Sequence, residues 1–255
     1  MTDRSTGADH EMIWLAAFRR ACDRIGAAAR TMSPAERRAP TGDGAGGDVT
    51  VMIDRVAEDI VIAELRALGL PLTLVSEEVG TVEIAGGGPP VVVVDPIDGS
   101  LNAKRGLPVF STSIALAEGP SMGDVVLGLV RDHGCGEEWT ATRGGGARLD
   151  GRPITAGDPA TDDHLELLLV EGAFPARLAG IVEMLDGRVG RIRALGSLAL
   201  SLCHTAGGRG DALVCLGPGR TVDVAAAQLI AREAGLRVGL PDAASLPGIP
   251  LDLGT

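Results

Sequence analysis

The sequence predicts a mixed α/β protein. Helical and strand-like patterns alternate along the chain, and four valines at 91–94 are typical of a buried strand. Acidic residues follow these valines directly. Open α/β sheets bind their ligands at the carboxyl ends of strands. We therefore expect the functional site at the end of this strand.

Composition restricts the class of protein. A chain of 255 residues can form one large or two small domains, and 45% hydrophobic residues are ample for a core. The net charge of -11 argues against nucleic acid or an anionic membrane as a general partner. No apolar run approaches membrane-spanning length, and the four cysteines lack metal-like spacing. We expect a cytoplasmic protein with reduced thiols.

The elements of the first half follow from periodicity. Apolar residues at helical spacing predict helices over residues 8–32 and 49–68, with Asp9 as a candidate cap of the first. The Gly-, Thr- and Asp-rich stretch between them predicts a loop at 40–48. Strands are expected at 72–75, 91–94, 108–117 and 124–132, followed by a hairpin-like run over 136–154 with an Asp150-Gly151 turn.

The second half alternates strands and helices. Strands are expected at 165–171, 188–194 and 211–216, and helices at 175–185, from Gly196 to His204 and at 224–234. The tail over 236–255 is rich in Pro, Gly and Leu. This half therefore reads as a second α/β part of the chain.

The residues after the valines hold the densest group of reactive side chains. Asp95 and Asp98 enclose Pro96 and Ile97, and Gly99 and Ser100 follow at once. Oxygen ligands at this density suit a hard cation such as Mg2+. The N-H groups of the glycine and the serine could bind an anion. The structural alternative is a strand-to-helix loop in which the first aspartate starts a turn and the second is an N-cap.

Other acidic segments stand around this stretch in a recognisable order. They are Asp54, Ser76-Glu77-Glu78 and Thr221-Val222-Asp223-Val224-Ala225-Ala226-Ala227. With Asp95-Pro96-Ile97-Asp98-Gly99-Ser100, they make residues 48–235 similar to the inositol monophosphatase and fructose-1,6-bisphosphatase superfamily of magnesium-dependent, lithium-sensitive phosphatases. Two segments, Asn102-Ala103-Lys104-Arg105-Gly106 and Arg220-Thr221-Val222-Asp223, look closer to the archaeal-type branch.

The resemblance implies a fold and an assembly. It implies a layered αβαβα sandwich with an α+β part at 1–150 and an α/β part at 151–255. Members of the archaeal-type branch usually have a final strand after the Glu-Ala-Gly segment, whereas only residues 236–255 follow it here. We therefore expect that strand to be missing or replaced. The resemblance also implies a homodimer.

The resemblance implies a role for each site residue. The ligands of two or three Mg2+ ions would be Glu77, Asp95, the Ile97 carbonyl, Asp98 and Asp223. Asp54 with Ser100 would activate water, and the N-H groups of Gly99 and Ser100 would bind phosphate. Substrate contacts are expected from Gly196 and Ser197, and from Arg191 and Arg193 unless these two arginines are ordinary surface charges. Neither Asp43 nor Asp48 can be assigned to a third metal.

The implied activity is phosphomonoester hydrolysis of a small sugar or polyol phosphate, of the fructose 1,6-bisphosphate or inositol monophosphate type. Leu216 stands seven residues before Asp223, where inositol phosphatases present a carboxylate, and this weakens the inositol phosphate alternative. A nucleotide or pathway-specific phosphatase is an alternative, although 2% aromatic residues offer little surface for stacking a base. A catalytically weak metal-binding dimer is another.

Overall fold

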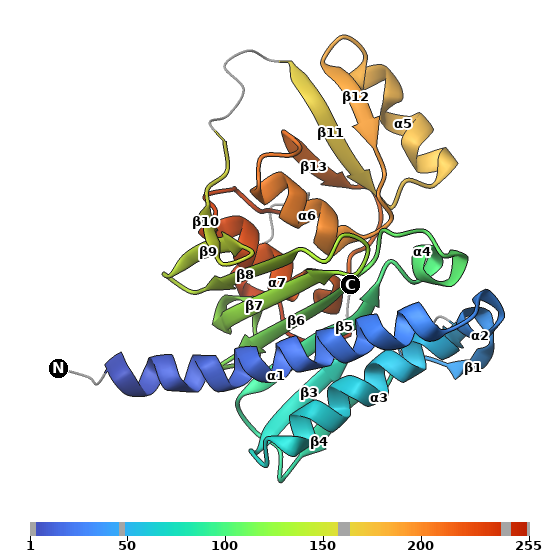
Figure 1. The fold of residues 1–255 in the computed structure, drawn as a ribbon. Coiled ribbons are helices and arrows are strands. Elements are labelled where there is room, and N and C mark those ends of the chain that lie inside the picture. The colour runs from blue at the N-terminus through green and yellow to red at the C-terminus, as the bar shows by residue number, and fades with distance from the viewer. Residues whose placement is uncertain (1–3, 46–48, 158–163, 241–245, 254–255) are drawn as a thin grey trace.

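The computed structural model describes residues 4–45, 49–157, 164–240 and 246–253, which form sheets with helices packed against them (Figure 1). The helices are α1 (Arg4–Thr31), α2 (Pro34–Arg38), α3 (Met52–Ala67), α4 (Ser100–Arg105), α5 (Pro175–Leu185), α6 (Leu198–Ala206) and α7 (Thr221–Glu233), with 3-10 helices η1 (Met122–Asp124) and η2 (Leu246–Gly248). None of these helices is long and apolar enough to cross a membrane.

The strands form a large, a small and a two-stranded sheet. Their bounds are β1 (Pro40–Asp43), β2 (Val49–Val51), β3 (Leu72–Ser76), β4 (Gly80–Ile84), β5 (Val91–Asp98), β6 (Ser111–Ala117), β7 (Val125–Asp132), β8 (Glu138–Thr142), β9 (Gly146–Leu149), β10 (Arg152–Ile154), β11 (Leu165–Glu171), β12 (Val189–Arg193) and β13 (Ala212–Cys215). The large sheet has the order β10-β9-β8-β7-β6-β5-β3-β4. The small sheet has the order β12-β11-β13, and β11 runs parallel to both neighbours.

Helices cover both faces of the large sheet (Figure 1). α1 and α3 cover one face, and α6 and α7 lie on the other. Side chains of β5 alternate between the two cores, because successive residues of a strand point to opposite faces: Val92 and Val94 join the α1/α3 side and Val93 joins the α7 side. The predicted mixed α/β fold is confirmed.

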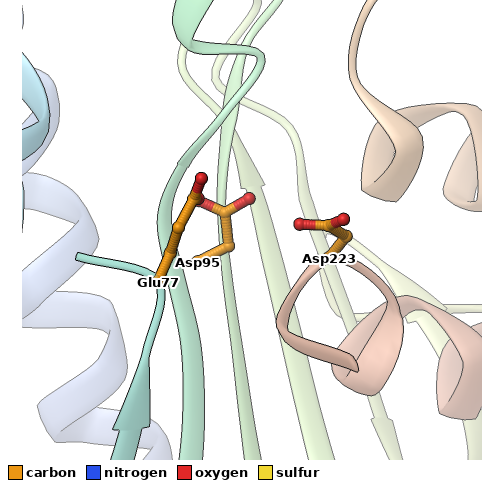
Figure 2. A group of neighbouring side chains, drawn as sticks. All are labelled: Glu77, Asp95 and Asp223. Atoms are coloured by element: carbon orange, nitrogen blue, oxygen red, sulfur yellow. The ribbon is translucent and has the colours of Figure 1, made fainter. Parts of the chain in front are cut away.

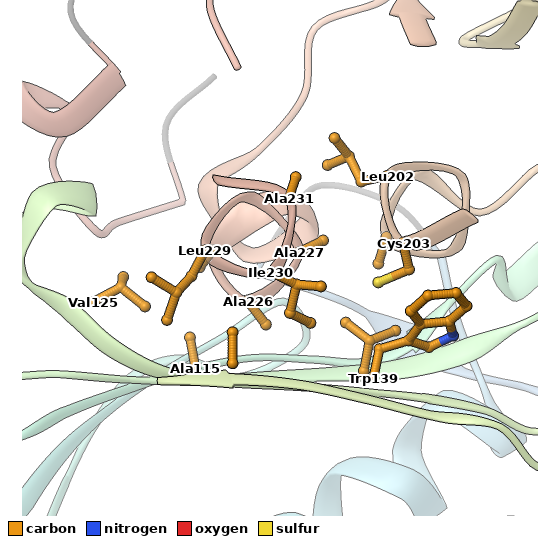
Figure 3. Packing of buried hydrophobic residues seen from close by; sticks show 14 of the residues in the cluster. Ala115, Val125, Trp139, Leu202, Cys203, Ala226, Ala227, Leu229, Ile230 and Ala231 are labelled. Carbon is orange, nitrogen blue, oxygen red and sulfur yellow. The ribbon is translucent and has the colours of Figure 1, made fainter. Parts of the chain in front are cut away.

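Small residues let α7 approach the sheet closely. A Cβ atom on Gly128 of β7 would lie 2.8 Å from the Ala226 carbonyl oxygen, so only glycine fits there. Figure 3 shows Ala226 and Ile230 facing the sheet beside Trp139. Since the core contains so few aromatic side chains, close packing of alanine, valine and leucine supplies most of its contact area. This packing fixes the first turn of α7 above the large sheet.

The small sheet and the tail complete the fold. α6 contacts strands of both sheets. Residues 236–240 and 246–253 form no strand and contain the 3-10 helix η2. This tail returns to the large sheet instead: the Met122 N-H donates to the Ile249 carbonyl over 2.8 Å, and Leu246 and Leu251 are buried.

Several boundary predictions were wrong. Residues 40–43, predicted as loop, form the exposed strand β1, which pairs with β2 through main-chain hydrogen bonds that composition does not reveal. The predicted helix over 49–68 starts three residues late because 49–51 belong to β2. The first helix begins at Arg4, so Asp9 lies inside it and is not its cap. Helix α2 and strand β4 were not predicted.

A bulge at the end of β5 shapes the functional region. Asp95 pairs with Ser113 and Asp98 with Ser111, so two residues of β5 oppose Thr112 alone. The Thr112 hydroxyl donates to the Pro96 carbonyl over 2.8 Å. This hydrogen bond satisfies a carbonyl that the bulge removes from the main-chain pairing between β5 and β6. The bulge also explains how a central strand accommodates a proline. It sets the directions in which the two aspartates project.

Candidate metal centre

A cluster of buried and partly buried carboxylates lies at the end of β5. Glu77 directly follows β3, Asp95 belongs to β5, and Asp223 is in the first turn of α7. An oxygen from each of the three lies within 4.8 Å of the others. Figure 2 shows Asp223 facing the pair formed by Glu77 and Asp95, which share a side-chain hydrogen bond. Sequence reasoning named all three, and the fold brings them together.

Asp98 lies beside this cluster but faces the start of α6. Its Oδ2 accepts hydrogen bonds from the Ser197 and Ser111 hydroxyls and, over 2.9 Å, from the Ala199 N-H. Among the described residues, its Oδ1 accepts one hydrogen bond, from the Leu198 N-H over 3.2 Å. An ionised carboxylate oxygen has two lone pairs, so Oδ1 keeps one for another partner.

Burial opposes ionisation of these carboxylates. It raises the pKa of Asp95 well above its usual range, and the charges of Glu77 and Asp98 raise it further. Burial also raises the pKa of Glu77, an effect that Arg220 opposes and Asp223 reinforces. The pKa of Asp98 is raised by burial too, against the effect of its hydrogen bonds. A bound cation would relieve this cost, and an all-oxygen donor set suits a hard divalent ion. The residues therefore fit a metal centre.

Asp54 and Ser100 form a pair next to the cluster. The Ser100 Oγ lies 3.0 Å from Asp54 Oδ1 and 2.9 Å from the Ile97 carbonyl oxygen, so its single proton can go to either. The Val51 N-H donates to Asp54 Oδ2 over 3.3 Å. Burial raises the pKa of Asp54 to about 6, although the Val51 N-H lowers it. A carboxylate with this pKa is suited to accept a proton near neutral pH.

Gly99 adopts a backbone conformation that favours glycine. Its φ is 95°, in the left-handed region, and a Cβ atom there would lie 3.0 Å from the Gly196 carbonyl oxygen. Gly99 is the N-cap of α4, and Ser100 is the first residue of that helix. The geometry leaves no room for a side chain at this turn.

Among the described residues, the cluster consists of Glu77, Asp95 and Asp223 and does not include Asp43. Asp43 is exposed on β1, and Asp48 lies outside the described residues. Glu78 accepts a hydrogen bond from the Thr50 hydroxyl, so it connects β2 to the end of β3.

Sequence reasoning gave Arg220 no role in the site. Its guanidinium lies 2.6 Å from Glu77 Oε1 and 3.1 Å from Asp223 Oδ1. No other basic side chain in the described part of the chain forms an ion pair with the three clustered carboxylates. The sequence contained one signal for this contact: Arg220 stands three residues before Asp223, and side chains at this spacing can contact each other at the start of a helix.

The predicted substrate contacts divide into two groups. Ser197 is buried as the N-cap of α6, and Gly196 precedes it with a left-handed φ of 79°. Arg191 and Arg193 are exposed on β12, where each donates to the main-chain carbonyl of the residue before it, Gly190 or Ile192. Among the described residues, no ion pair links these arginines to the cluster.

Glu171 holds the loop that carries Ser197, and sequence reasoning did not single it out. Its carboxylate accepts hydrogen bonds from the Leu195 N-H over 2.9 Å, the Gly196 N-H over 3.0 Å and the Ser201 hydroxyl over 2.6 Å. The one signal available in the sequence was a glutamate at the end of a predicted strand. Through this loop Glu171 orients the donors that hold Asp98.

Glu171→Gln is expected to lower kcat/KM for phosphate release about tenfold, because its amide group would face N-H donors that need an acceptor. The measurement is steady-state kinetics with a circular dichroism melt. Glu166→Gln, an exposed position on the same strand, is the matched control. Equal kinetics for the two variants would remove the positioning role from Glu171.

The fold and the site define a mixed α/β protein whose acidic cluster can bind a metal ion. Residues 14–252 match the model of the inositol monophosphatase family, and the chain belongs to that family. It is a phosphomonoesterase, as the sequence predicted.

Archaeal relatives support this membership. A protein of Methanothermobacter thermautotrophicus named fructose-1,6-bisphosphatase/inositol-1-monophosphatase is 36% identical over 203 residues, which are 75% of this chain and 71% of that protein. A protein of the same name from Archaeoglobus fulgidus is 33% identical over 223 residues, covering 86% of this chain and 81% of that one. Similarity to the archaeal-type branch, expected from sequence, is confirmed.

Solved structures of inositol monophosphatases have a similar fold. A Thermotoga maritima inositol monophosphatase aligns with a TM-score of 0.71 at 28% identity, covering 84% of this chain and 80% of that one.

Another relative, of Pseudomonas aeruginosa, is named Nus factor SuhB and is 36% identical over 199 residues, covering 74% of this chain and 70% of that protein. Relatives of similar identity therefore carry different names, and identity alone does not assign a substrate.

Proposed function

We propose that this protein hydrolyses a small sugar or polyol phosphate with the help of two or three Mg2+ ions. The observation that carries the proposal is the group of oxygens from buried Glu77 and Asp95 and partly buried Asp223, each within 4.8 Å of the others. Names of relatives support a substrate of the fructose 1,6-bisphosphate or inositol monophosphate type.

Each carboxylate has a place in this proposal. Glu77, Asp95 and the Ile97 carbonyl would hold one ion, and Asp95, Asp98 and Asp223 would hold another. The free lone pair of Asp98 Oδ1 is compatible with this role. Bound Mg2+ would supply a Lewis acid that lowers the pKa of water and neutralises charge on the leaving oxygen.

Side chains of the protein would orient the attacking water and accept its proton. Ser100 would direct the attacking water toward Asp54, whose carboxylate takes the proton. The N-H groups of Gly99 and Ser100 would bind phosphate oxygens. Gly196 and Ser197 would face the organic half of the substrate. Their exposure leaves Arg191 and Arg193 free to meet a second anionic group of a larger substrate.

Location and assembly belong to the same proposal. The four cysteines of the chain, Cys22, Cys135, Cys203 and Cys215, are free thiols, which supports a reducing, cytoplasmic location. A homodimer is expected from family resemblance, and size-exclusion chromatography with light scattering measures it.

A panel of phosphate esters tests the activity. We expect phosphate release from fructose 1,6-bisphosphate, inositol 1-phosphate or a related sugar phosphate with Mg2+, its loss in EDTA, and inhibition by millimolar lithium. Nucleotide phosphates in the same panel test the alternative substrate class. If the folded protein releases no phosphate from any member of the panel with Mg2+, the proposal is contradicted and a non-catalytic role is favoured. Activity unchanged in high millimolar lithium would remove the lithium expectation alone.

A further inference from the structure

Arg220 occupies an unusual position for a basic residue in a site that is expected to bind cations. Its guanidinium joins Glu77 at the end of β3 to Asp223 in α7, two elements that meet only in the folded protein. The three side chains are 21%, 12% and 13% exposed, so water screens their interaction only in part. The arrangement is a largely desolvated ion triad.

The start of α7 does not depend on the contact between the Arg220 guanidinium and Glu77. Arg220 is the N-cap of α7, and its main-chain N-H donates to Asp223 Oδ2 over 2.9 Å. Its side chain could therefore leave Glu77 while the helix start keeps its cap. The contact with Glu77 is the part that can change without unfolding α7.

A guanidinium and a divalent ion compete for the same oxygens. Glu77 and Asp223 each contribute an oxygen to the cluster, and Arg220 contacts both residues. A divalent ion among these oxygens would place two cations a few ångströms apart, where their repulsion is strong in a poorly hydrated site. One of the cations must then move away.

We propose that Arg220 is an internal counter-cation of the cluster, which holds Glu77 and Asp223 together without metal and leaves Glu77 when a divalent ion binds. This inference rests on the proposed function in one respect, that the cluster binds a divalent cation. It assigns Arg220 two effects: it stabilises the metal-free fold and it weakens metal binding.

Arg220→Gln tests both effects, with Mn2+ as the probe in isothermal titration calorimetry. We expect Mn2+ to bind the variant about tenfold more tightly than the wild type, because no guanidinium has to be displaced. In EDTA, the Tm of the variant should be lower by about 5 °C, since the carboxylates lose their cation. At saturating Mn2+ the two Tm values should agree, or the variant's should be higher.

Arg232→Gln is the matched control, because it removes the same charge from the exposed end of the same helix. It should change neither Mn2+ affinity nor either Tm. Equal or weaker Mn2+ binding by Arg220→Gln would overturn the inference, as would a Tm deficit of equal size in EDTA and in Mn2+, which would mean that Arg220 never leaves Glu77.

Further outcomes separate this inference from the proposed function. If neither the wild type nor Arg220→Gln binds Mn2+, both the inference and the proposed function are contradicted. If the wild type binds Mn2+ and releases phosphate while Arg220→Gln binds no more tightly, only the role of Arg220 falls. Should Arg220→Gln fail to fold, Arg220→Lys takes its place, since an ammonium cannot span both carboxylates as a guanidinium fork does. Tighter Mn2+ binding than wild type is again required.

Discussion

Asp95→Asn is expected to lower phosphate release about a thousandfold at saturating Mg2+. Asp95 is 2% exposed and is the carboxylate that both proposed ions would share, so one substitution weakens both. Loss of several kcal/mol of charge stabilisation corresponds to this factor. The measurement is kcat for the best substrate of the panel.

The same variant should fold well, which distinguishes lost chemistry from lost structure. Asparagine keeps an oxygen to accept the Ile97 N-H, which Asp95 Oδ1 accepts over 3.0 Å. It also removes a buried charge that its neighbours repel, so the Tm in EDTA should rise above that of the wild type. Asp59→Asn, at an exposed aspartate of α3, is the control and should leave both quantities unchanged. Substantial turnover by Asp95→Asn would contradict the proposed metal centre.

Metal-free protein should lose stability as pH rises from 5 to 8, and Mg2+ should abolish most of the loss. The pKa of Asp54 is raised to about 6, and those of Glu77, Asp95 and Asp98 are raised as well, all mainly by burial. A group with a raised folded-state pKa contributes stability below its unfolded pKa and loses that contribution as pH rises through the folded value. For Asp54 this window runs from about 4 to about 6, and the clustered groups extend it upward.

The expected size follows from one of these groups. For Asp54, only the part of the window above pH 5 is lost over this range, about one pKa unit, which corresponds to about 1.4 kcal/mol and to a fall in Tm of about 3 °C or more. His133 and His204 oppose the trend below about pH 6.5, because burial lowers their pKa values. They are fewer than the four carboxylates, so the net slope stays negative.

Thermal melts in EDTA and in Mg2+ at pH 5, 6, 7 and 8 measure this effect. Asp54→Asn, which is neutral throughout, should show a flatter curve in EDTA than the wild type. A wild-type Tm in EDTA that is constant or increases over this range would contradict the electrostatic account of the cluster.

Much of the site could be predicted from sequence because its residues occur in short, ordered motifs. The valines at 91–94 predicted a buried strand, and the Asp95 to Ser100 run predicted its chemistry. Local pattern could not predict the strand at 40–43, since its residues are exposed and the strand is defined by its pairing with β2. Glu171 was missed because its importance comes from loop donors more than twenty residues away in the sequence.

The sequence by itself determined the mixed α/β class, the family and the identities of the carboxylates, because these depend on residue order and periodicity. The tertiary structure alone decided how those groups meet. It brings Asp223 of α7 to Glu77 and Asp95 at the large sheet, points Asp98 toward the start of α6, and places Arg220 against the cluster. The physical reason is that burial, distance and charge pairing depend on elements packing together over long separations, and one-dimensional spacing contains none of these quantities.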